Sequence, residues 1–253
     1  MLAVTRKNEI KEIVLEKKSV TVTELSKQFS VTEETIRRDL KALEDEGFLL
    51  RTYGGAFIQD GVQNEVEMTI RETAYVESKK IIARKCLELV HNGDSIFLDS
   101  STTAMFVCNQ IKDMRLTVLT NSLKITNLLS DCANINLITI GGIFTPQYMA
   151  FLGKSTLQAM GGFFVDKAFL SCRSLSMEHG ITDSNEQIAE LRQKVLERAN
   201  QTFLIADYSK FNKTSFIKIC DFDEIQCIIT DKKQKQEWHE FLDSKSVRLY
   251  ECE

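Results

Sequence analysis

The stretch from Thr23 to Ala56 constrains the fold of this chain more than any other part. Its sequence predicts a helix, a tight turn, a second helix and then a small hairpin whose turn contains Gly54 and Gly55. Thr32 is suited to cap the second helix, because its hydroxyl can accept a hydrogen bond from a free backbone N–H in the first turn. The apolar residues of that helix share one face at helical spacing, and they are Ile36, Leu40 and Leu43.

This order of elements is that of a winged helix-turn-helix, whose second helix enters the DNA major groove. The face of the helix opposite the apolar residues is polar and basic, as a DNA-reading face should be. The residues that we expect to contact DNA are Thr32, Thr35, Arg37, Arg38, Lys41 and, in the hairpin or wing, Arg51. We further expect a first helix over 6–16, a short strand over 20–22 pairing with the wing, a helix end at Gly47, and wing strands over 48–53 and 56–58.

Two other interpretations explain part of this pattern. A solvated amphipathic helix shows the same periodicity and often carries arginines on its wet face. A winged helix can also act as a protein-contact module. Charge does not decide the matter, because residues 1–57 hold ten Lys or Arg and ten Asp or Glu. A module of zero net charge must sort its basic residues onto one surface, and joining two modules in a dimer would strengthen DNA binding.

Several spaced elements of this N-terminal quarter form one signature. They are Thr35–Leu40 (TIRRDL), Leu43-Glu44, Gly47, Arg51 and Gly54–Ala56 (GGA). In order and spacing they resemble the DeoR family of bacterial transcription regulators. The resemblance implies a DNA-binding repressor with a C-terminal domain that senses a sugar phosphate.

Residues 77–253 alternate short apolar strands with helices, the pattern of a parallel sheet covered on both faces. The expected strands are 95–99, 116–120, 135–140, 167–172, 202–206, 225–230 and 247–250, and the expected helices are 77–90, 102–111, 123–129, 185–199 and 235–242. Residues 58–76 are polar and lack a clear period, which is typical of a linker. We therefore expect an α/β protein with a small winged helix-turn-helix at 1–57, a linker at 58–76 and a larger α/β domain with a mostly parallel sheet at 77–253.

The ends of four expected strands carry the groups that a small phosphorylated ligand needs. In open parallel sheets, ligands bind beyond the carboxyl ends of the strands. A helix that begins there offers backbone N–H groups to a phosphate, and glycine lets a ligand approach the backbone. The candidate ligand-binding residues are Asp99, Ser100, Ser101, Thr102, Thr103, Thr120, Asn121, Gly141, Gly142, Asp207 and Lys210. Each feature also has a plainer explanation: a helix cap, a turn, or a surface ion pair.

Short elements of this region form a second signature. They are Asp99–Thr103 (DSSTT), Thr120-Asn121, Gly141-Gly142, Asp166–Phe169 (DKAF), Gly180–Thr182 (GIT) and Ala206–Phe211 (ADYSKF). They resemble the DeoR sensor domain, which is similar in fold to ribose-5-phosphate isomerase and CoA transferases. The resemblance implies that loop 99–103 holds phosphate or sugar hydroxyls and that Lys210 contacts the ligand. Many relatives have a glycine in that loop, where this chain has Ser100-Ser101. Relatives also place an acid near the start of helix 185–199, for which Glu186 and Glu190 both qualify.

Composition narrows the function further. Hydrophobic residues make up 43% of the 253 residues, and the net charge of −4 argues against a generally basic nucleic-acid coat. No apolar stretch suggests a signal peptide or a membrane span, so we expect a cytoplasmic protein without a membrane partner. The seven cysteines are scattered and the three histidines are not at ligand spacing. We therefore expect reduced cysteines, no metal site and no cofactor.

Two functions fit these observations. The first is a regulator, expected to repress sugar-metabolism genes, that binds double-stranded operator DNA as a homo-oligomer of at least two chains and responds to a phosphorylated sugar. The alternative is an enzyme related to sugar-phosphate isomerases that carries a DNA-binding module. In that enzyme Asp99, Asp207 and Lys210 would supply acid–base groups. The sequence contains no recognisable catalytic set, so we expect binding without catalysis.

Overall fold

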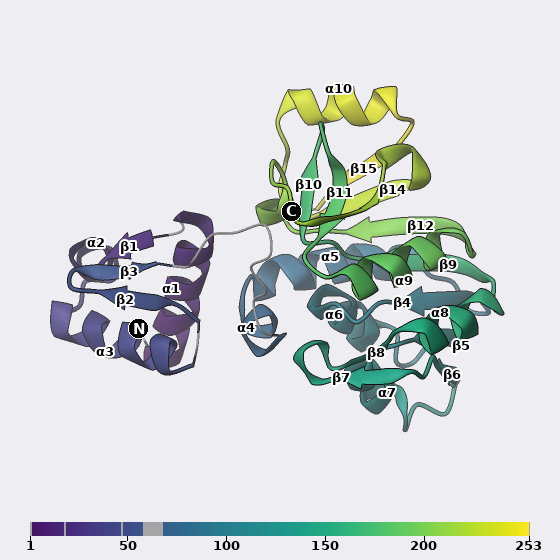
Figure 1. Ribbon diagram of the computed structural model, residues 1–253, viewed down its shortest axis with the longest axis horizontal. Helices are drawn as coiled ribbons and strands as arrows, with labels where there is room; N and C mark the ends of the chain where they lie inside the picture. The colour runs from purple at the N-terminus through teal and green to yellow at the C-terminus, as the bar shows by residue number, and fades with distance from the viewer. Residues whose placement is uncertain (1, 18, 47, 58–67, 253) are drawn as a thin grey trace. The chain divides into compact units, whose positions relative to one another are not determined.

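The computed structural model describes residues 2–17, 19–46, 48–57 and 68–252. Contacts divide the chain into two units, Met1–Val76 and Glu77–Glu253. Within the described ranges, every helix is too short or too polar to span a lipid bilayer. The first unit contains α1 (Ala3–Lys17), β1 (Ser19–Thr21), α2 (Val22–Phe29), α3 (Glu33–Asp45), β2 (Leu50–Thr52), β3 (Gly55–Phe57) and α4 (Met68–Thr73) (Figure 1).

The first unit is a three-helix core closed by a small sheet. Thr21 and Glu24 form a capping box at the start of α2, and Thr32 caps α3 by accepting a hydrogen bond from the backbone N–H of Thr35. The antiparallel sheet has the order β1-β3-β2. Gly55 is required there, because a Cβ at this position would lie 2.0 Å from the carbonyl oxygen of Val20. These elements meet in one apolar core that includes Ile10, Val14, Leu25, Ile36, Leu40, Leu43 and Phe48.

The predicted order of helices and strands in this unit is present, with differences at the boundaries. The first helix, expected over 6–16, begins earlier, at Ala3. The strand expected over 48–53 is limited to Leu50–Thr52, since Phe48 turns into the core with only 5% of its surface exposed. The short strand expected over 20–22 ends at Thr21, which caps α2. The expected linker over 58–76 contains the helix α4. Gly47, Ile58 and the rest of 58–67 lie outside the described residues.

The second unit is built on a seven-stranded sheet with further small elements around it. Its elements begin with α5 (Val76–Leu89), β4 (Ser95–Leu98), α6 (Thr102–Gln110), β5 (Leu116–Thr120), α7 (Leu123–Leu129), β6 (Ile135–Thr139), β7 (Ile143–Thr145), the 3₁₀ helix η1 (Pro146–Tyr148), β8 (Ala150–Leu152) and α8 (Lys154–Gly161). They continue with β9 (Val165–Leu170), β10 (Ser174–Ser176), β11 (Gly180–Asp183), α9 (Glu186–Leu196), β12 (Ala199–Ile205), η2 (Tyr208–Lys210), β13 (Ile217–Cys220), η3 (Phe222–Glu224), β14 (Cys227–Thr230), α10 (Gln236–Ser244) and β15 (Arg248–Glu251).

The large sheet has the order β15-β14-β12-β9-β4-β5-β6, and all of its pairings are parallel. Successive side chains of a strand point to opposite faces, so both faces need cover. In β4, Ile96 and Leu98 pack into a core with α5, α6 and α7. Phe97, between them, packs into a second core with α8 and α9. The predicted α/β architecture, with its mostly parallel sheet, is therefore confirmed.

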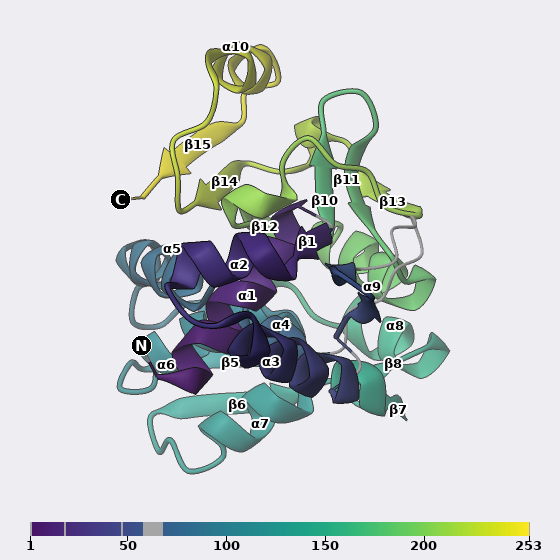
Figure 2. The ribbon, with the colours of Figure 1, turned by 90° about the vertical axis from the view of Figure 1, so that its left-hand side faces the viewer.

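Several elements of this unit were not predicted. These are the hairpin β7–β8, the helix α8 and the three-stranded sheet β10-β11-β13, which appears beside β12 and β14 in Figure 2. Their strands are only three or four residues long. A strand this short completes too few alternations to give a period-2 signal in the sequence.

The order of the strands defines where a ligand would enter the sheet. The chain builds β4, β5 and β6 outward in one direction, and then returns to place β9, β12, β14 and β15 on the other side of β4. The direction of winding therefore reverses between β4 and β9. In open parallel sheets a crevice forms at such a reversal, outside the carboxyl ends of the strands.

Candidate functional site

The helix α3 separates its anchoring residues from its exposed residues. Ile36, Leu40 and Leu43 are buried in the first unit. On the other face, Arg38 keeps 80% of its side chain exposed, and Arg37 keeps 42%. Among the other predicted DNA contacts, Thr32, Lys41 and Arg51 are exposed and Thr35 is half-buried. The structure thus brings the predicted residues of α3 to its outer side.

Each arginine of this face has an acidic partner one turn earlier. Arg37 pairs with Glu33 at 2.9 Å, and Arg38 pairs with Glu34 at 3.5 Å. Exposed pairs of this kind contribute about 0–1 kcal/mol. A DNA phosphate or a guanine edge can therefore replace either glutamate at small cost. These pairs explain how a module of zero net charge can still present arginines for DNA.

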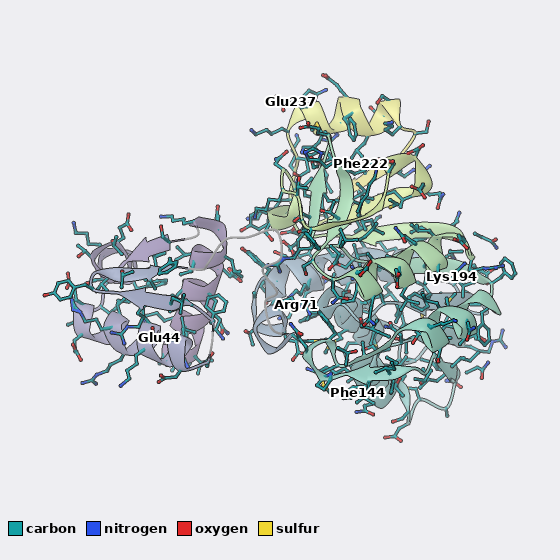
Figure 3. The ribbon with its side chains drawn as sticks, in the orientation of Figure 1. Glu44, Arg71, Phe144, Lys194, Phe222 and Glu237 are labelled. Atoms are coloured by element: carbon teal, nitrogen blue, oxygen red, sulfur yellow. The ribbon has the colours of Figure 1, made fainter. Side chains whose placement is uncertain are left out.

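The side chain of Glu44 links the wing to α3. Glu44, labelled in Figure 3, accepts a hydrogen bond of 2.9 Å from the backbone N–H of Arg51 and lies 3.6 Å from the Arg51 guanidinium. The acid thereby holds the wing strand β2 at a set distance from the helix. Arg51 remains one-third exposed.

A buried ion pair anchors α3 to α1, and we did not predict it. The Arg6 guanidinium donates to both carboxylate oxygens of Asp39, at 2.6 and 3.3 Å, and both side chains are less than a tenth exposed. The hydrogen bond to Asp39 raises the pKa of Arg6 above its usual value. One signal was present in the sequence, because Asp39 lies between Ile36 and Leu40 on the inward side of the helix.

At the reversal of the large sheet, the residues form a buried charge cluster around Arg192 of α9. Its guanidinium donates to Asp99 at 2.8 and 3.0 Å, and it also pairs closely with Asp183. Burial lowers the pKa of Arg192, but the charges of Asp99 and Asp183 outweigh that effect and raise it overall. Sequence reasoning missed both Arg192 and Asp183, since an arginine in an amphipathic helix normally faces water.

Asp99, predicted to bind ligand directly, is occupied within the protein. Besides Arg192, it accepts hydrogen bonds from the backbone N–H of Ser101 at 3.0 Å and of Ser171 at 2.8 Å. Ser171 follows β9, so the carboxylate links the ends of the two strands that flank the reversal. Its role in this structure is to position the 99–103 loop.

Other predicted residues of the loops also have structural partners. Ser101 caps α6 by accepting from the backbone N–H of Ala104 at 3.0 Å. The Thr120 hydroxyl donates to the carbonyl of Leu98 and accepts from the backbone N–H of Ser122. Ser100, Thr102 and Thr103 are buried beside them at the start of α6.

Asn121 contributes an unsatisfied polar group to this site. Its amide Nδ2 donates to the carbonyl of Phe151 at 3.1 Å, whereas its buried Oδ1 has no hydrogen-bond partner among the described residues. The side chain borders a small cavity lined by Phe97, Asp99, Ser100, Asn121, Leu152, Ile188, Leu191 and Arg192. The cavity volume is about 10 Å³, which is room for one water molecule.

The end of β12 brings a second cation near this cluster. The Asp207 carboxylate accepts from the backbone N–H of Ser209 and so caps the turn η2 that carries Lys210. Burial raises the pKa of the Cys172 thiol to about 12, although the nearby charges of Lys210 and Arg192 act in the opposite direction. Lys210, Arg192 and Cys172 therefore belong to one electrostatic neighbourhood, in which the thiol stays neutral.

Gly141 and Gly142 lie away from that neighbourhood. They follow β6, four strands from β12, and strands spaced about 4.8 Å apart place the two ends about 19 Å from each other. Gly142 is also closely packed, because a Cβ there would lie 2.0 Å from the Thr156 hydroxyl. These glycines therefore lie on the β6 side of the reversal and Lys210 on the β12 side. Glu186 and Glu190 are the two candidates for the acid expected near the start of helix 185–199. Both side chains are exposed on α9.

Comparison with known proteins identifies both units. A family model for the DeoR C-terminal sensor domain matches residues 74–232, and one for the DeoR-like helix-turn-helix domain matches residues 6–61. The chain belongs to the DeoR family. The expected resemblance is thus confirmed over most of the sequence, and this DeoR-family protein is a DNA-binding regulator of transcription.

Its DeoR relatives are named as regulators. The chain is 39% identical to the uncharacterized HTH-type transcriptional regulator YulB of Bacillus subtilis, covering 98% of this chain and 96% of that protein. It is 32% identical to the B. subtilis transcriptional repressor GlcR, covering 91% and 89%. It is 33% identical to the L-fucose operon activator of Escherichia coli, covering 90% and 95%. These names favour a regulator over the alternative of an isomerase-like enzyme.

The solved structures that match this DeoR-family chain are distant from it. Ribose 5-phosphate isomerase A from Methanocaldococcus jannaschii matches with a TM-score of 0.40 and 18% identity over 55% of each chain. A likeness of this size carries no argument about function.

Proposed function

We propose that this DeoR-family chain is a repressor of sugar-metabolism genes whose binding to operator DNA is controlled by a phosphorylated sugar. Residues 1–57 would bind DNA, residues 58–76 would connect the parts, and residues 77–253 would bind the ligand. The observation that carries the proposal lies at the sheet reversal, where the buried Asn121 Oδ1 has no hydrogen-bond partner among the described residues and Asn121 lines one cavity with Ser100, just before α6. The same chain has an exposed arginine face on α3.

The ligand contacts that we propose are Asn121, the residues at the start of α6 and Lys210. The sugar would donate a hydroxyl hydrogen to Asn121 Oδ1. Its phosphate would take hydrogen bonds from Ser100, Thr102 and Thr103 at the N-terminal end of α6, where the helix dipole favours an anion. Lys210 would add positive charge. Asp99 and Arg192 would hold the loop in place instead of touching the ligand.

Ligand binding must also widen the site. The cavity beside Asn121 has a volume of about 10 Å³, far less than a sugar needs. Two elements line it besides the strand ends: α9, through Ile188, Leu191 and Arg192, and β8, through Leu152. A ligand that enters therefore moves at least one of them. It alters DNA binding only if its affinity differs between the two arrangements of the protein.

Replacing Lys210 with alanine tests the ligand site. In a thermal-shift panel, a phosphorylated sugar at a hundred times its dissociation constant should stabilise the wild type by about 2.7 kcal/mol, and its unphosphorylated counterpart should not. Lys210→Ala should abolish that shift and the effect of the ligand on DNA affinity, while DNA binding itself persists. Lys233→Ala, which removes an exposed lysine of the same unit, is the control and should show the wild-type ligand response. A full ligand response in Lys210→Ala would exclude the proposed contact.

Replacing Arg38 with alanine tests the DNA face. One arginine bound to a guanine edge contributes about 1–3 kcal/mol, so operator affinity should fall by roughly 10- to 100-fold. Stability should not change, because Arg38 is 80% exposed and its pairing with Glu34 is weak. Fluorescence anisotropy with labelled operator DNA measures the affinity, and the exposed Lys17→Ala on α1 is the control. Equal affinities for the wild type and Arg38→Ala would place the recognition surface elsewhere.

A further inference from the structure

One long stretch of the second unit contains no charged residue. Residues 132–153 lie between Asp131 and Lys154 and include no Asp, Glu, Lys, Arg or His. Charged residues make up 27% of the chain, so a stretch of this length would hold about six of them. The segment comprises the strand β6, the hairpin β7–β8 and the 3₁₀ helix η1 between the hairpin strands.

This uncharged segment is not hidden in the core. Its exposed residues are Ala133, Asn134, Asn136, Thr139, Gly141, Gly142, Ile143, Phe144, Pro146 and Gln147. Ile143 is 71% exposed and Phe144, labelled in Figure 3, is 39% exposed. Single exposed apolar residues are common, but Ile143 and Phe144 are adjacent in the sequence and lie within an exposed segment free of charge, as residues of interaction surfaces often do.

The segment also lacks the usual protection of a sheet edge. In the described part of the chain, β6 has a neighbouring strand, β5, on one side only. Edge strands normally carry lysine, proline or another charged residue that discourages a second chain from pairing with them. The sequence of β6, INLIT, has none of these.

The lack of charge identifies the partner. A partner of opposite charge would require charges on this surface. In a two-fold dimer the same surface lies on both sides, so every charge near the axis would meet its own like charge. A surface without charges is complementary to itself, and charged residues are depleted at the centres of subunit interfaces. We propose that residues 132–153 form the surface through which two copies of this chain associate.

Contacts with the rest of the unit hold this surface in a fixed shape. The backbone N–H of Phe151 donates to the carbonyl of Asn121 at 2.8 Å, and the Asn121 amide donates back to the Phe151 carbonyl at 3.1 Å. The Thr156 hydroxyl donates to the carbonyl of Gly141 at 3.0 Å. A surface that is already ordered loses less conformational freedom on association. The Asn121 contacts also connect it to the ligand site, a link that rests on the proposed function.

The test is the mass of the full-length chain in solution, measured by light scattering after gel filtration over a range of concentrations. The wild type should form a dimer or a larger oligomer. Ile143→Asp places two like charges across the interface and should raise the dissociation constant of the two copies at least tenfold. The measured mass should then fall, from a dimer to a monomer or from a larger oligomer to half its size. Phe216→Asp is the matched control: Phe216 is 53% exposed in the same unit, outside the segment, and this variant should keep the wild-type mass.

Folding and function are checked separately. Because Ile143 is mostly exposed, Ile143→Asp should unfold at the same denaturant concentration as the wild type when diluted to its monomeric range. Asn136→Lys, which adds a charge to β6, should weaken association in the same direction. A wild type that is monomeric at all concentrations, or an Ile143→Asp variant with unchanged mass, would refute this surface. If no phosphorylated sugar shifts the unfolding temperature of the wild type, that result would count against the proposed function and not against this surface.

Discussion

Replacing Arg192 with methionine should destabilise the second unit by about 3–5 kcal/mol, the cost of removing one partner from a buried ion pair. Asp99 and Asp183 would then remain in the interior, 3% and 7% exposed, without their cation. Methionine keeps most of the volume of the side chain, so the loss reports on charge and hydrogen bonding more than on packing. The ligand response should fall as well, because Asp99 links the strand ends that flank the site.

The chain offers a convenient reporter for this measurement. Its one tryptophan, Trp238, is buried in the second unit, so its fluorescence follows the unfolding of that unit in urea. Arg192→Lys should be intermediate, because lysine keeps the charge but cannot hold two carboxylates with a planar fork. Arg115→Met removes an exposed arginine of the same unit and should have almost no effect. Unchanged unfolding of Arg192→Met would mean that the cluster adds nothing to stability.

Replacing Asp39 with alanine should destabilise the first unit by about 3 kcal/mol, because it leaves the Arg6 guanidinium buried without its acceptor. A unit of this size has a total stability of only a few kcal/mol, so much of it would unfold. Operator binding should be lost, although Asp39 is not itself on the DNA face. Loss of helical circular dichroism with unchanged Trp238 fluorescence would localise the damage to the first unit.

Two further variants separate charge from packing in this pair. Asp45→Ala removes an exposed carboxylate from the same helix and should leave stability unchanged or slightly higher, because a negative charge near a helix C-terminus is unfavourable. The double variant Arg6→Met with Asp39→Leu replaces both charges and should recover part of the stability. If Asp39→Ala unfolds at the wild-type temperature, the pair does not anchor α3.

Local sequence patterns predicted those features of the fold that depend on neighbouring residues. The spacing of Ile36, Leu40 and Leu43 placed the inner face of α3, and Thr32 caps that helix as expected. Most strands of the large sheet were recognisable because they contain a short apolar run, such as Ile96–Leu98 in β4. The three-residue strands of the hairpin β7–β8 gave no comparable signal, and they were missed.

The residues of the candidate ligand site could be proposed from the sequence, but their internal contacts could not. Its residues follow the carboxyl ends of parallel strands, a rule that needs only the order of elements. The pairing of Asp99 with Arg192 joins residues 93 positions apart, and the pairing of Arg6 with Asp39 joins residues 33 apart. Contacts of such long range leave no local period. The sequence therefore indicated Asp99 as a ligand contact but did not reveal the hydrogen bonds that its carboxylate accepts from Ser171 and Arg192.

The neighbouring residues Arg38 and Asp39 of α3 differ in their surroundings. Asp39 is fixed to α1 by Arg6, while Arg38, one residue earlier, extends into solvent. Because the anchoring side chains and the outward side chains are different residues, substitutions at the outward positions change little in the folding free energy. If these outward side chains read the operator as we propose, a lineage built on this scaffold can be retargeted to a new operator by exchanging a few of them, without changes to the residues that fold the unit.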